Sequence, residues 1–468
     1  MADIVVAGAG LGGLLAALLL AGDGHRVTLV ERDGGTAPDD PSVAWEEWPR
    51  RGVPQFRQLF YLLPRFRQLA ERELPDVVAA LDAVALRHQP MAEINTTLTE
   101  SDAEIVALTA RRPVVEAAVA QVAARDARID IRRGAAVLGL VPGQPVVPGV
   151  PHVTGVVTDG GEIAADLVVD ATGRRSPLSR WLTDIGSRPL PEVVEDSGFV
   201  YHSRHFRSPD GSVPALRGPL LQHFGSLSVL TLPAEGGTWG VGLITSSRDD
   251  ALRSLHRVDR WDAVARALTP VAHWLDGEPI TDVEVMTRLE DRRRTLCPDG
   301  RPLVTGVAPV ADAWASTNPT LGRGTTLALL HAVALRDTIR TVGLADPARF
   351  AVAWHDTTEG ELGPAYDAVI TADRHRLAEI DAAVDGVAYD GTDVAWRAYR
   401  MLEDVAHLDA DLLRGWFRIA GLVASGTDVF SENGFLRRVS RAARRHHPSP
   451  PVITRDRLVA LARGLSEP

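Results

Sequence analysis

The stretch DIVVAGAGLGG, residues 3–13, decides the fold of this 468-residue chain. Its β-branched first half predicts a buried strand, and residues 14–20, all Leu or Ala, predict a buried helix directly after it. Gly8, Gly10 and Gly13 follow the G-x-G-x-x-G spacing. The first glycine allows a tight turn, the second lets the backbone approach a pyrophosphate, and the third permits close packing of helix on strand. The N–H groups at the helix N-terminus can bind that anion.

A second strand, predicted over residues 25–30, ends in an acidic side chain. Glu31 stands about 20 residues after the glycines, where a carboxylate binds a ribose hydroxyl and disfavours a ribose phosphate. Arg32, its neighbour, is a further candidate for contact with the same ligand. Strand, turn, helix and second strand together predict a Rossmann-like dinucleotide-binding domain, and either FAD or NAD would fit these residues.

The composition excludes several classes of protein. The net charge is −11, and no basic stripe is interleaved with aromatic residues, which argues against a nucleic-acid partner. Cys297 is the single cysteine, so the chain can form no intramolecular disulfide and no thiolate zinc site. We therefore predict no metal and a cytoplasmic location. The sequence contains no lysine, so all 50 Lys and Arg residues are arginine and a lysine-dependent mechanism is excluded.

Residues 4–22 carry no charge, as in a signal peptide or a membrane span. No positive segment precedes them, Asp3 stands at their start, and five glycines interrupt them in the dinucleotide-binding pattern. We therefore predict no targeting segment and no stable membrane insertion.

A second informative stretch, ADAWASTNPTLGRGTT at residues 311–326, follows a predicted strand and leads into an apolar helix over residues 327–335. Gly322 and Gly324 leave a surface without side chains on which a flat ring can lie, and the N-terminus of the following helix can stabilise negative charge on that ring. We also expect Gly324 to need a backbone angle that valine resists. A plain turn before a helix is the alternative interpretation.

Together with the glycine pattern, this stretch resembles the p-hydroxybenzoate hydroxylase-like family of flavoprotein monooxygenases. The resemblance implies that Asp312 holds the ribityl chain of FAD, and that Pro319 with the following glycines wraps the isoalloxazine ring at a helix N-terminus. It therefore selects FAD over NAD. Asn318, Pro319, Gly322 and Gly324 are our candidates for the catalytic loop. The resemblance covers nearly all of the first 340 residues and only loosely the rest.

A predicted buried strand and tight turn, DLVVDATGRRS at residues 166–176, resembles the mid-chain motif of the same family, with Thr172 in place of its Asp. In the family that Asp is linked to the FAD pyrophosphate and to nicotinamide use, so the handling of NAD(P)H stays open. A strand and turn with a solvated arginine pair is an equal alternative to a direct FAD contact. Ala311 also replaces a glycine of the family, which predicts a different backbone approach near Asp312.

Two further segments contain arginine candidates for FAD contact. Arg112 opens a predicted helix where the family has an Arg directed at FAD phosphate or ribose, and Arg111 is the weaker candidate. RGVPQFR at residues 51–57 resembles a segment that lies beside the flavin in actinobacterial polyketide epoxidases and their relatives, so Arg57 is a cofactor-binding candidate. Those relatives often carry a His shortly afterwards. Phe60 occupies that neighbourhood here, so no histidine role is implied.

The FAD-binding domain of this family is discontinuous, and we expect a mixed α/β chain built around it. Strands predicted at residues 218–232 and 238–244, joined by a turn at 235–237, would form an inserted antiparallel sheet that roofs the flavin. The expected division assigns residues 1–75, 105–182 and 290–340 to the FAD-binding domain, 76–104 and 183–289 to the substrate domain, and 341–468 to a C-terminal helical region.

The substrate side offers weaker candidates. Trp314 and Asn318, beside the flavin loop, are the better ones. A charged helix face is predicted for Asp373, Arg374 and Arg376. The polar residues on the roof strands are weaker candidates, because a histidine on a sheet is more often structural than ligand-binding. These roof candidates are His202, His205, Gln222 and His223.

The motifs predict an FAD-dependent monooxygenase that hydroxylates or epoxidises a small organic substrate through a flavin hydroperoxide shielded from water. The all-arginine, alanine-rich composition suggests a high-GC genome, in which relatives often act on natural products. The alternatives are a flavin-dependent reductase or dehydrogenase acting on a double bond, and a flavin-binding structural or sensing protein. A flavin-dependent halogenase is nearly excluded, because it relies on a lysine.

The electron source stays open at this point. A single dinucleotide fingerprint is present, so NAD(P)H has no evident Rossmann site of its own. Either NAD(P)H docks transiently or a separate flavin reductase supplies reduced FAD.

Overall fold

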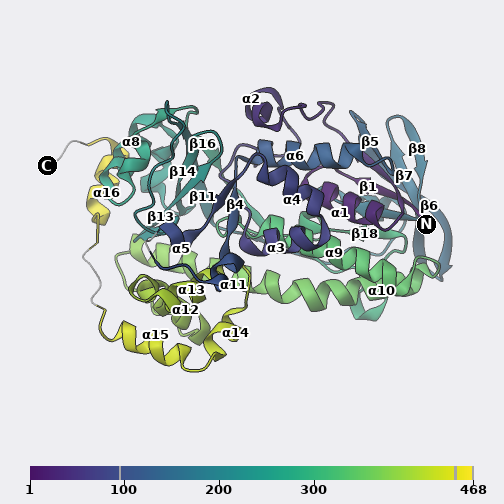
Figure 1. Cartoon of the computed structure of the whole chain (residues 1–468). Coiled ribbons are helices and arrows are strands. Elements are labelled where there is room, and N and C mark those ends of the chain that lie inside the picture. Colours follow the sequence, from purple (N-terminus) through teal and green to yellow (C-terminus); the bar gives the residue numbers. More distant parts are fainter. Residues whose placement is uncertain (94–95, 447–450, 466–468) are drawn as a thin grey trace.

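The computed structural model describes residues 1–93, 96–446 and 451–465, and it confirms the predicted mixed α/β class (Figure 1). The central sheet is parallel throughout. Its strands are rich in Val, Leu and Ile because both faces of the sheet are covered. In sheet order the strands are β18 (Val307–Pro309), β9 (Leu167–Asp170), β1 (Asp3–Ala7), β2 (Arg26–Glu31) and β5 (Ile129–Arg133).

Helices pack together against one face of this sheet. Helix α1 (Leu11–Gly22) is apolar all round because it lies in the protein interior, and it confirms the helix predicted after the glycines. α6 (Arg112–Arg125) and α9 (Gly324–Val342) contact α1. Three outer helices pack on α6 or α9. Helix α4 (Pro75–Asp82) contacts α6, and α3 (Pro64–Glu73) and α10 (Pro347–Thr357) contact α9.

The largest hydrophobic core lies between the parallel sheet and these helices. Val77 and Leu81 of α4 belong to this core, although residues 76–104 were expected to form part of the substrate domain. The division of the chain into domains remains a prediction.

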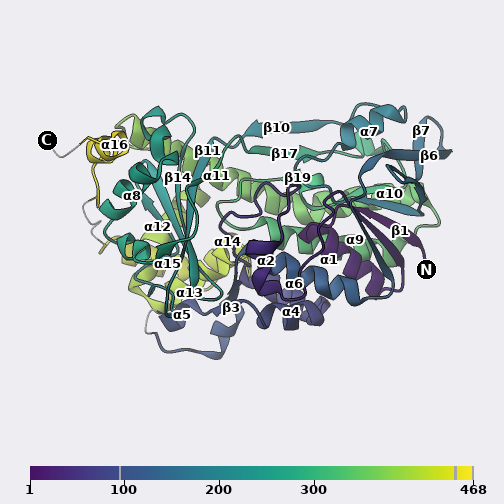
Figure 2. The same ribbon diagram turned by 90° about the horizontal axis from the view of Figure 1, so that it is seen from above.

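Small antiparallel sheets flank the central one. A meander of β6 (Val137–Val147), β7 (Val150–Thr158) and β8 (Gly161–Ala164) contacts β9 and β1. A narrow ribbon runs from the parallel sheet toward the roof (Figure 2). It consists of β10 (Glu192–Asp196), β17 (Glu290–Arg294) and β19 (Ala315–Ser316), while β3 (Leu86–His88) pairs with β4 (Ala107–Thr109). Helix α7 (Leu178–Asp184) packs on β6.

The roof is an antiparallel sheet, as predicted. The hairpin expected around residues 235–237 is confirmed, since β13 (Leu227–Ala234) and β14 (Thr238–Ser246) are joined there and both Gly236 and Gly237 have positive φ. Helices α8 (Val258–Ala267) and α16 (Arg455–Arg463) pack together and share a hydrophobic core with the roof. The roof strands are β12 (Leu221–Phe224), β13 (Leu227–Ala234), β14 (Thr238–Ser246), β11 (Phe199–Arg207), β15 (Glu278–Pro279) and β16 (Glu284–Met286).

The chain continues as helices after α10, in the green to yellow part of Figure 1. α11 (Gly363–Val384) contacts roof strand β14. The remaining helices are α12 (Val394–Val405), α13 (Ala410–Ala420), α14 (Gly426–Ser431) and α15 (Phe435–Ala443), and two short helices occur earlier, α2 (Ala44–Glu47) and α5 (Pro90–Glu93). Among the described residues, no helix has the length and apolar character needed to cross a membrane.

Candidate cofactor and active site

The three glycines of the first motif meet different surroundings. Gly8 has a φ of +104°, and a Cβ there would lie 2.5 Å from the Ala171 carbonyl oxygen. A Cβ on Gly13 would lie 1.9 Å from the Gly8 oxygen, so helix and strand approach as closely as predicted. A Cβ on Gly10 would meet nothing within 4 Å. Gly10 therefore leaves open space at the N-terminus of α1, where a pyrophosphate fits.

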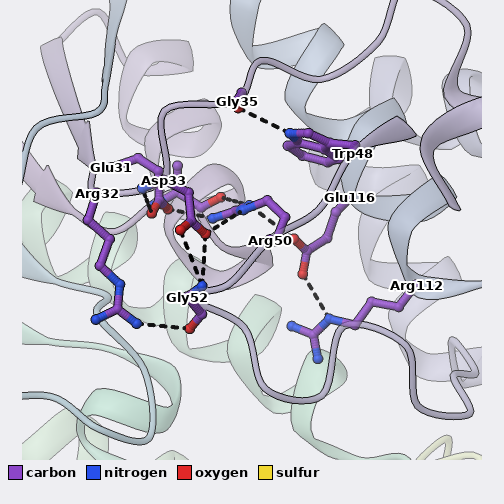
Figure 3. Close-up of polar contacts among 10 residues, drawn as sticks. Glu31, Arg32, Asp33, Gly35, Trp48, Arg50, Gly52, Arg112 and Glu116 are labelled. Atoms are coloured by element: carbon purple, nitrogen blue, oxygen red, sulfur yellow. Dashed lines mark hydrogen bonds and ion pairs between the residues drawn. The ribbon is translucent and has the colours of Figure 1, made fainter. Parts of the chain in front are cut away.

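Glu31, at the carboxyl end of β2, is buried and already well bonded (Figure 3). Its Oε2 accepts from the Ala9 N–H (2.9 Å) and from Arg50 Nη2 (2.5 Å), and its Oε1 accepts from the Asp33 N–H (3.0 Å). A carboxylate offers about four lone-pair positions, so one remains on Oε1. That position is free for one donor, and the contact of Glu31 with a ribose hydroxyl stays a prediction.

Arg50 links the carboxylates around Glu31, and sequence reasoning did not find it. Its side chain is 1% exposed and lies among Glu31, Asp33 and Glu116 (Figure 3). It also donates to the Ala9 carbonyl (2.9 Å). Burial lowers the pKa of Arg50, but Glu116 and the other carboxylates outweigh burial and raise it overall. The only sequence signal was its place beside the segment at residues 51–57.

Two of the predicted cofactor-binding arginines lie near this network (Figure 3). Arg112, at the start of α6, donates to Glu116 (2.8 Å), and its guanidinium lies 5.5 Å from the centre of the Phe60 ring. Arg32 is exposed and donates to the Gly52 carbonyl (3.1 Å). The structure therefore places Arg112 in the buried charge network, and Arg32 at its solvent side.

Arg57 lies apart from that network, under the roof. Its guanidinium donates to the Trp45 carbonyl (2.9 Å) and stands 5.1 Å from the centre of the Trp45 ring. Arg111 stands 5.0 Å from the same ring and pairs with Glu235 of the roof hairpin (2.5 Å). His205 contacts Trp45 as well (4.7 Å between ring centres). These contacts join the roof to the start of α6.

The mid-chain motif bonds to itself and to neighbouring strands. The N–H and Oγ1 of Thr172 both donate to Asp170 Oδ1 (3.0 and 2.6 Å). Arg174 donates to the carbonyls of Glu290 (2.9 Å) and Thr317 (2.5 Å). Arg174 is therefore not merely solvated. It links ribbon strand β17 to Thr317, the residue that precedes the candidate catalytic loop.

Ala311 begins the late motif with an unusual backbone. Its φ is +52°, in the left-handed region that glycine adopts readily and that costs other residues roughly 1–2 kcal/mol. A Cβ on Gly12 would lie 3.1 Å from the Ala311 Cβ, so this turn touches the glycine motif directly. Asp312 follows, partly exposed, and lines a small pocket together with Gly324. No other described side chain pairs with Asp312, which leaves its carboxylate available to a ligand.

His331 holds the Ala311 turn from helix α9. Its Nδ1 accepts from the Ala311 N–H (3.0 Å), and its Nε2 lies 3.2 Å from Thr358 Oγ1. The ring is 1% exposed and stacks on Trp354 (4.6 Å between ring centres). Burial lowers the pKa of His331 to about 3, so the imidazole is neutral and Nδ1 stays an acceptor. The only sequence signal was its place as the one polar residue in the apolar run over residues 327–335.

We expect His331→Leu to bind FAD about tenfold more weakly than His331→Asn. Both variants lose the stacking on Trp354, but the Asn oxygen replaces Nδ1 as acceptor, and an unpaired buried N–H costs roughly 1–3 kcal/mol. FAD titration of the two apoproteins measures the difference. Equal FAD affinities of the two variants would show that His331 does not position the turn.

The candidate catalytic loop, residues 318–324, joins the late motif to α9. Gly322 has a φ of +65° and lies near the Tyr61 carbonyl oxygen (3.8 Å from a Cβ placed there). Gly324 is exposed and begins α9 with an ordinary helical backbone, so the special backbone angle expected at Gly324 is wrong. Only Gly322 has that angle, because the chain turns sharply there into α9. Pro319 accepts from the Gly322 N–H (2.9 Å).

Asn318 is buried at the start of this loop, and strands β17 and β11 and the loop itself hold it. Its N–H donates to Asp291 Oδ1 of β17 (2.7 Å), and its Nδ2 donates to Thr320 Oγ1 (2.8 Å). The Tyr201 hydroxyl of roof strand β11 donates to Asn318 Oδ1. Among the described residues, neither α9 nor α1 has a side chain that caps its N-terminus, so both ends can bind an anion.

The roof candidates alternate between its two faces. His205 faces Trp45, and His223 bonds to Ser228 (2.9 Å) on the side of α11 and α12. His202 accepts through its carbonyl from Trp261 Nε1 (2.8 Å), below α8. Gln222 donates to the Pro219 carbonyl (3.1 Å). Burial lowers the pKa of His202 to about 4 and, with Arg111 and Arg57, that of His205 to about 3.

The charged helix face predicted on α11 is wrong for two of its three residues. Asp373 is 6% and Arg376 8% exposed, because α11 packs these side chains against the catalytic loop and the roof. Arg374 alone is exposed, where it pairs with Glu195 (2.6 Å). Trp314, the other candidate near the flavin loop, is buried between His331 and Tyr366.

Comparison with known proteins agrees with this geometry. No family model matches the sequence. Solved structures that match include pqsL, a probable FAD-dependent monooxygenase from Pseudomonas aeruginosa (17% identity, 82% of this chain and 99% of that chain, TM-score 0.57). OxyS anhydrotetracycline hydroxylase from Streptomyces rimosus matches with 19% identity over 90% of this chain and 76% of that chain, at a TM-score of 0.56. HpxO from Klebsiella pneumoniae, complexed with FAD, matches with 15% identity, 93% and 99% coverage and a TM-score of 0.56.

The fold is therefore that of the FAD-dependent monooxygenases of the p-hydroxybenzoate hydroxylase-like type, as the motifs implied. Within that fold, the chain belongs to the same family as Protein Rv3254 of Mycobacterium tuberculosis. The two are 30% identical over 487 aligned residues, which span 96% of this chain and 92% of the mycobacterial protein.

Proposed function

We propose that the protein is an FAD-dependent monooxygenase that hydroxylates or epoxidises a small organic substrate. One observation carries the proposal: the glycine cradle and the late motif meet. Gly12 at the start of α1 lies against the Ala311 turn before Asp312, and Asp312 shares a small pocket with Gly324 at the start of α9. In this proposal the pyrophosphate site and the ring site are neighbours, and the Asp312 carboxylate favours FAD over NAD because only FAD has ribityl hydroxyls for it to bind.

Each part of the site has a task in this proposal. Gly10 and the N-terminus of α1 bind the pyrophosphate, the open position on Glu31 binds the ribose, and Asp312 binds the ribityl hydroxyls. The N-terminus of α9 faces the ring and stabilises negative charge on it. FAD, when bound, supplies electron transfer and the activation of dioxygen. The roof and the loop from Asn318 exclude water from the reacting groups.

The partners follow from the same interpretation. We propose a small-molecule substrate, no nucleic acid, and reducing equivalents from NAD(P)H, supplied directly or through a separate flavin reductase. The single dinucleotide fingerprint supports this arrangement, because it leaves no second Rossmann site for a resident nicotinamide. The absence of lysine argues against halogenation on the same fold. A natural-product substrate and a cytoplasmic location complete the proposal.

The product is expected to carry one atom from dioxygen. The purified protein should first release FAD when denatured by acid. Incubation with a reductant, labelled dioxygen and a panel of hydroxylation and epoxidation substrates, followed by mass spectrometry, then tests the fate of the oxygen. Unlabelled product that forms equally well without air would instead identify a flavin-dependent reductase or dehydrogenase acting on a double bond.

A further inference from the structure

Helix α15 has a basic face on the side opposite its buried residues. Its apolar side packs into a small hydrophobic core of the C-terminal helical region through Phe435 and Val439, which are 7% and 0% exposed. The backbone keeps turning through Arg445, whose N–H donates to the Ala442 carbonyl (3.0 Å). The packing fixes the orientation of the helix, and with it the face that is turned to solvent.

Four exposed arginines lie together on this outer face. They are Arg437, Arg441, Arg444 and Arg445. At 3.6 residues per turn, these positions fall within about 100° of one another around the helix axis, opposite Val439. They extend over roughly 12 Å along the axis, so a single partner surface can meet all four charges. Within the described ranges, none of the four side chains has a hydrogen bond or an ion pair.

The carboxylates that contact α15 bind a different arginine. Arg438 Nη2 lies 2.8 Å from Asp409 Oδ1, and its Nη1 lies 2.9 Å from Asp411 Oδ2, both at the start of α13. The outer face therefore keeps its positive charge. The whole chain carries a net charge of −11, but charges beyond a Debye length of about 8 Å are largely screened at physiological ionic strength. A surface that approaches α15 thus meets mainly arginines.

Exposed leucines lie beside the basic face. Leu436 of α15 is 45% exposed, and Leu408, which is 52% exposed, follows His407. The His407 ring lies 5.7 Å from that of His446 at the end of α15, which places Leu408 near the arginines. Helix α15 lies at the outer edge of the molecule, where a large partner can approach it (Figure 1). Arginines with leucines beside them are typical of helices that lie on a membrane surface.

We propose that α15 docks the protein on a membrane surface that contains anionic lipids. The four arginines bind lipid phosphates, and Leu436 and Leu408 enter the headgroup region. Binding is peripheral and reversible, because the apolar contribution is limited to these side chains. This inference goes beyond the oxygenase chemistry and does not depend on it.

Other anionic partners fit this face less well. Single-stranded nucleic acid stacks its bases on aromatic side chains, but the one aromatic residue of α15, Phe435, is buried. A specific protein interface buries about 800 Å² on each partner around an apolar centre. Here the charges are at the centre, and Leu436 is at the edge. A lipid surface needs no apolar centre, since its phosphates can surround the helix.

Sedimentation with vesicles tests the proposal on the full chain. The vesicles consist of phosphatidylcholine alone or with about one-third phosphatidylglycerol, and the bound fraction is measured against lipid concentration. An arginine near an anionic surface strengthens binding about fivefold, the equivalent of ~1 kcal/mol. We therefore expect the wild type to bind the anionic vesicles about 100-fold or more tightly than phosphatidylcholine. Binding should be lost in about 0.5 M salt.

Two matched double variants locate the surface. Arg437→Gln combined with Arg441→Gln should weaken binding to the anionic vesicles about 25-fold, because two of the four arginines are removed. Arg125→Gln combined with Arg180→Gln gives the same change of net charge at exposed arginines of α6 and α7, which have no side-chain partner in the described part of the chain. This control should bind as the wild type does. Leu436→Gln should weaken binding about fivefold at constant charge.

Three results would contradict the membrane surface. The wild type could fail to bind anionic vesicles at low salt, or it could bind both kinds of vesicle equally. Equal losses in the two double variants would trace binding to net charge and not to α15. Retention on immobilised polyglutamate without vesicle binding would assign the face to an acidic protein instead, and would overturn the proposal too. The comparison of vesicles uses the wild type, so it stands if a variant fails to fold.

Discussion

Gly10→Ala and Gly13→Ala are expected to fail in opposite ways, although both change one glycine of the same motif to the same residue. A Cβ on Gly10 meets nothing within 4 Å, and the backbone there, with φ −77° and ψ 177°, is accessible to alanine. Gly10→Ala should therefore keep the fold. Its new methyl group occupies the place where the pyrophosphate approaches, so FAD affinity should fall about 100-fold, equivalent to about 2.8 kcal/mol.

Gly13→Ala should instead damage the fold. Its Cβ would lie 1.9 Å from the Gly8 oxygen, a backbone atom, so α1 and β1 must move apart. Overpacking of a core typically costs about 1–3 kcal/mol and occasionally more. Circular dichroism and urea denaturation of the apoproteins measure the fold, and FAD titration measures the cofactor site. A Gly10→Ala protein that binds FAD normally would mean that no pyrophosphate lies at this turn.

Arg50→Met is expected to destabilise the apoprotein by about 3–5 kcal/mol, because removing one partner of a buried ion pair leaves uncompensated buried charge. Arg50 is the shared partner of Glu31, Asp33 and Glu116, and its side chain is 1% exposed. Methionine keeps much of the side-chain volume, so the change reports mainly the loss of charge. The free energy of unfolding in urea measures the effect.

Arg51→Met is the matched control. Arg51 is the next residue, is exposed, and has no ion pair or hydrogen bond within the described ranges. Its substitution should change the free energy of unfolding by no more than about 0.5 kcal/mol. Equal effects of the two substitutions would show that the carboxylates around Arg50 are stabilised by other means, such as water.

Local sequence patterns by themselves predict the dinucleotide-binding core. The spacing of Gly8, Gly10 and Gly13, the apolar run after them, and Glu31 at the end of β2 lie within one strand-helix-strand unit. Their geometry depends on neighbours close in sequence, so period and spacing suffice to predict it. The roof hairpin was predictable for the same reason, since Gly236 and Gly237 make its turn.

Tertiary structure alone decided which charged and polar residues are buried. Arg50 and Arg51 are indistinguishable in sequence, and Arg50 is internal only because the fold brings Glu31, Asp33 and Glu116, 17 to 66 residues away, around its guanidinium. His331 reaches back 20 residues to Ala311, and Asp373 meets a loop about 50 residues earlier only because α11 folds against it. The cost of burying a charge or an N–H depends on partners from distant segments. The periodicity of a sequence therefore predicts which face of a helix is apolar. Which polar side chains can be buried on that face depends on the partners that the tertiary structure brings to them.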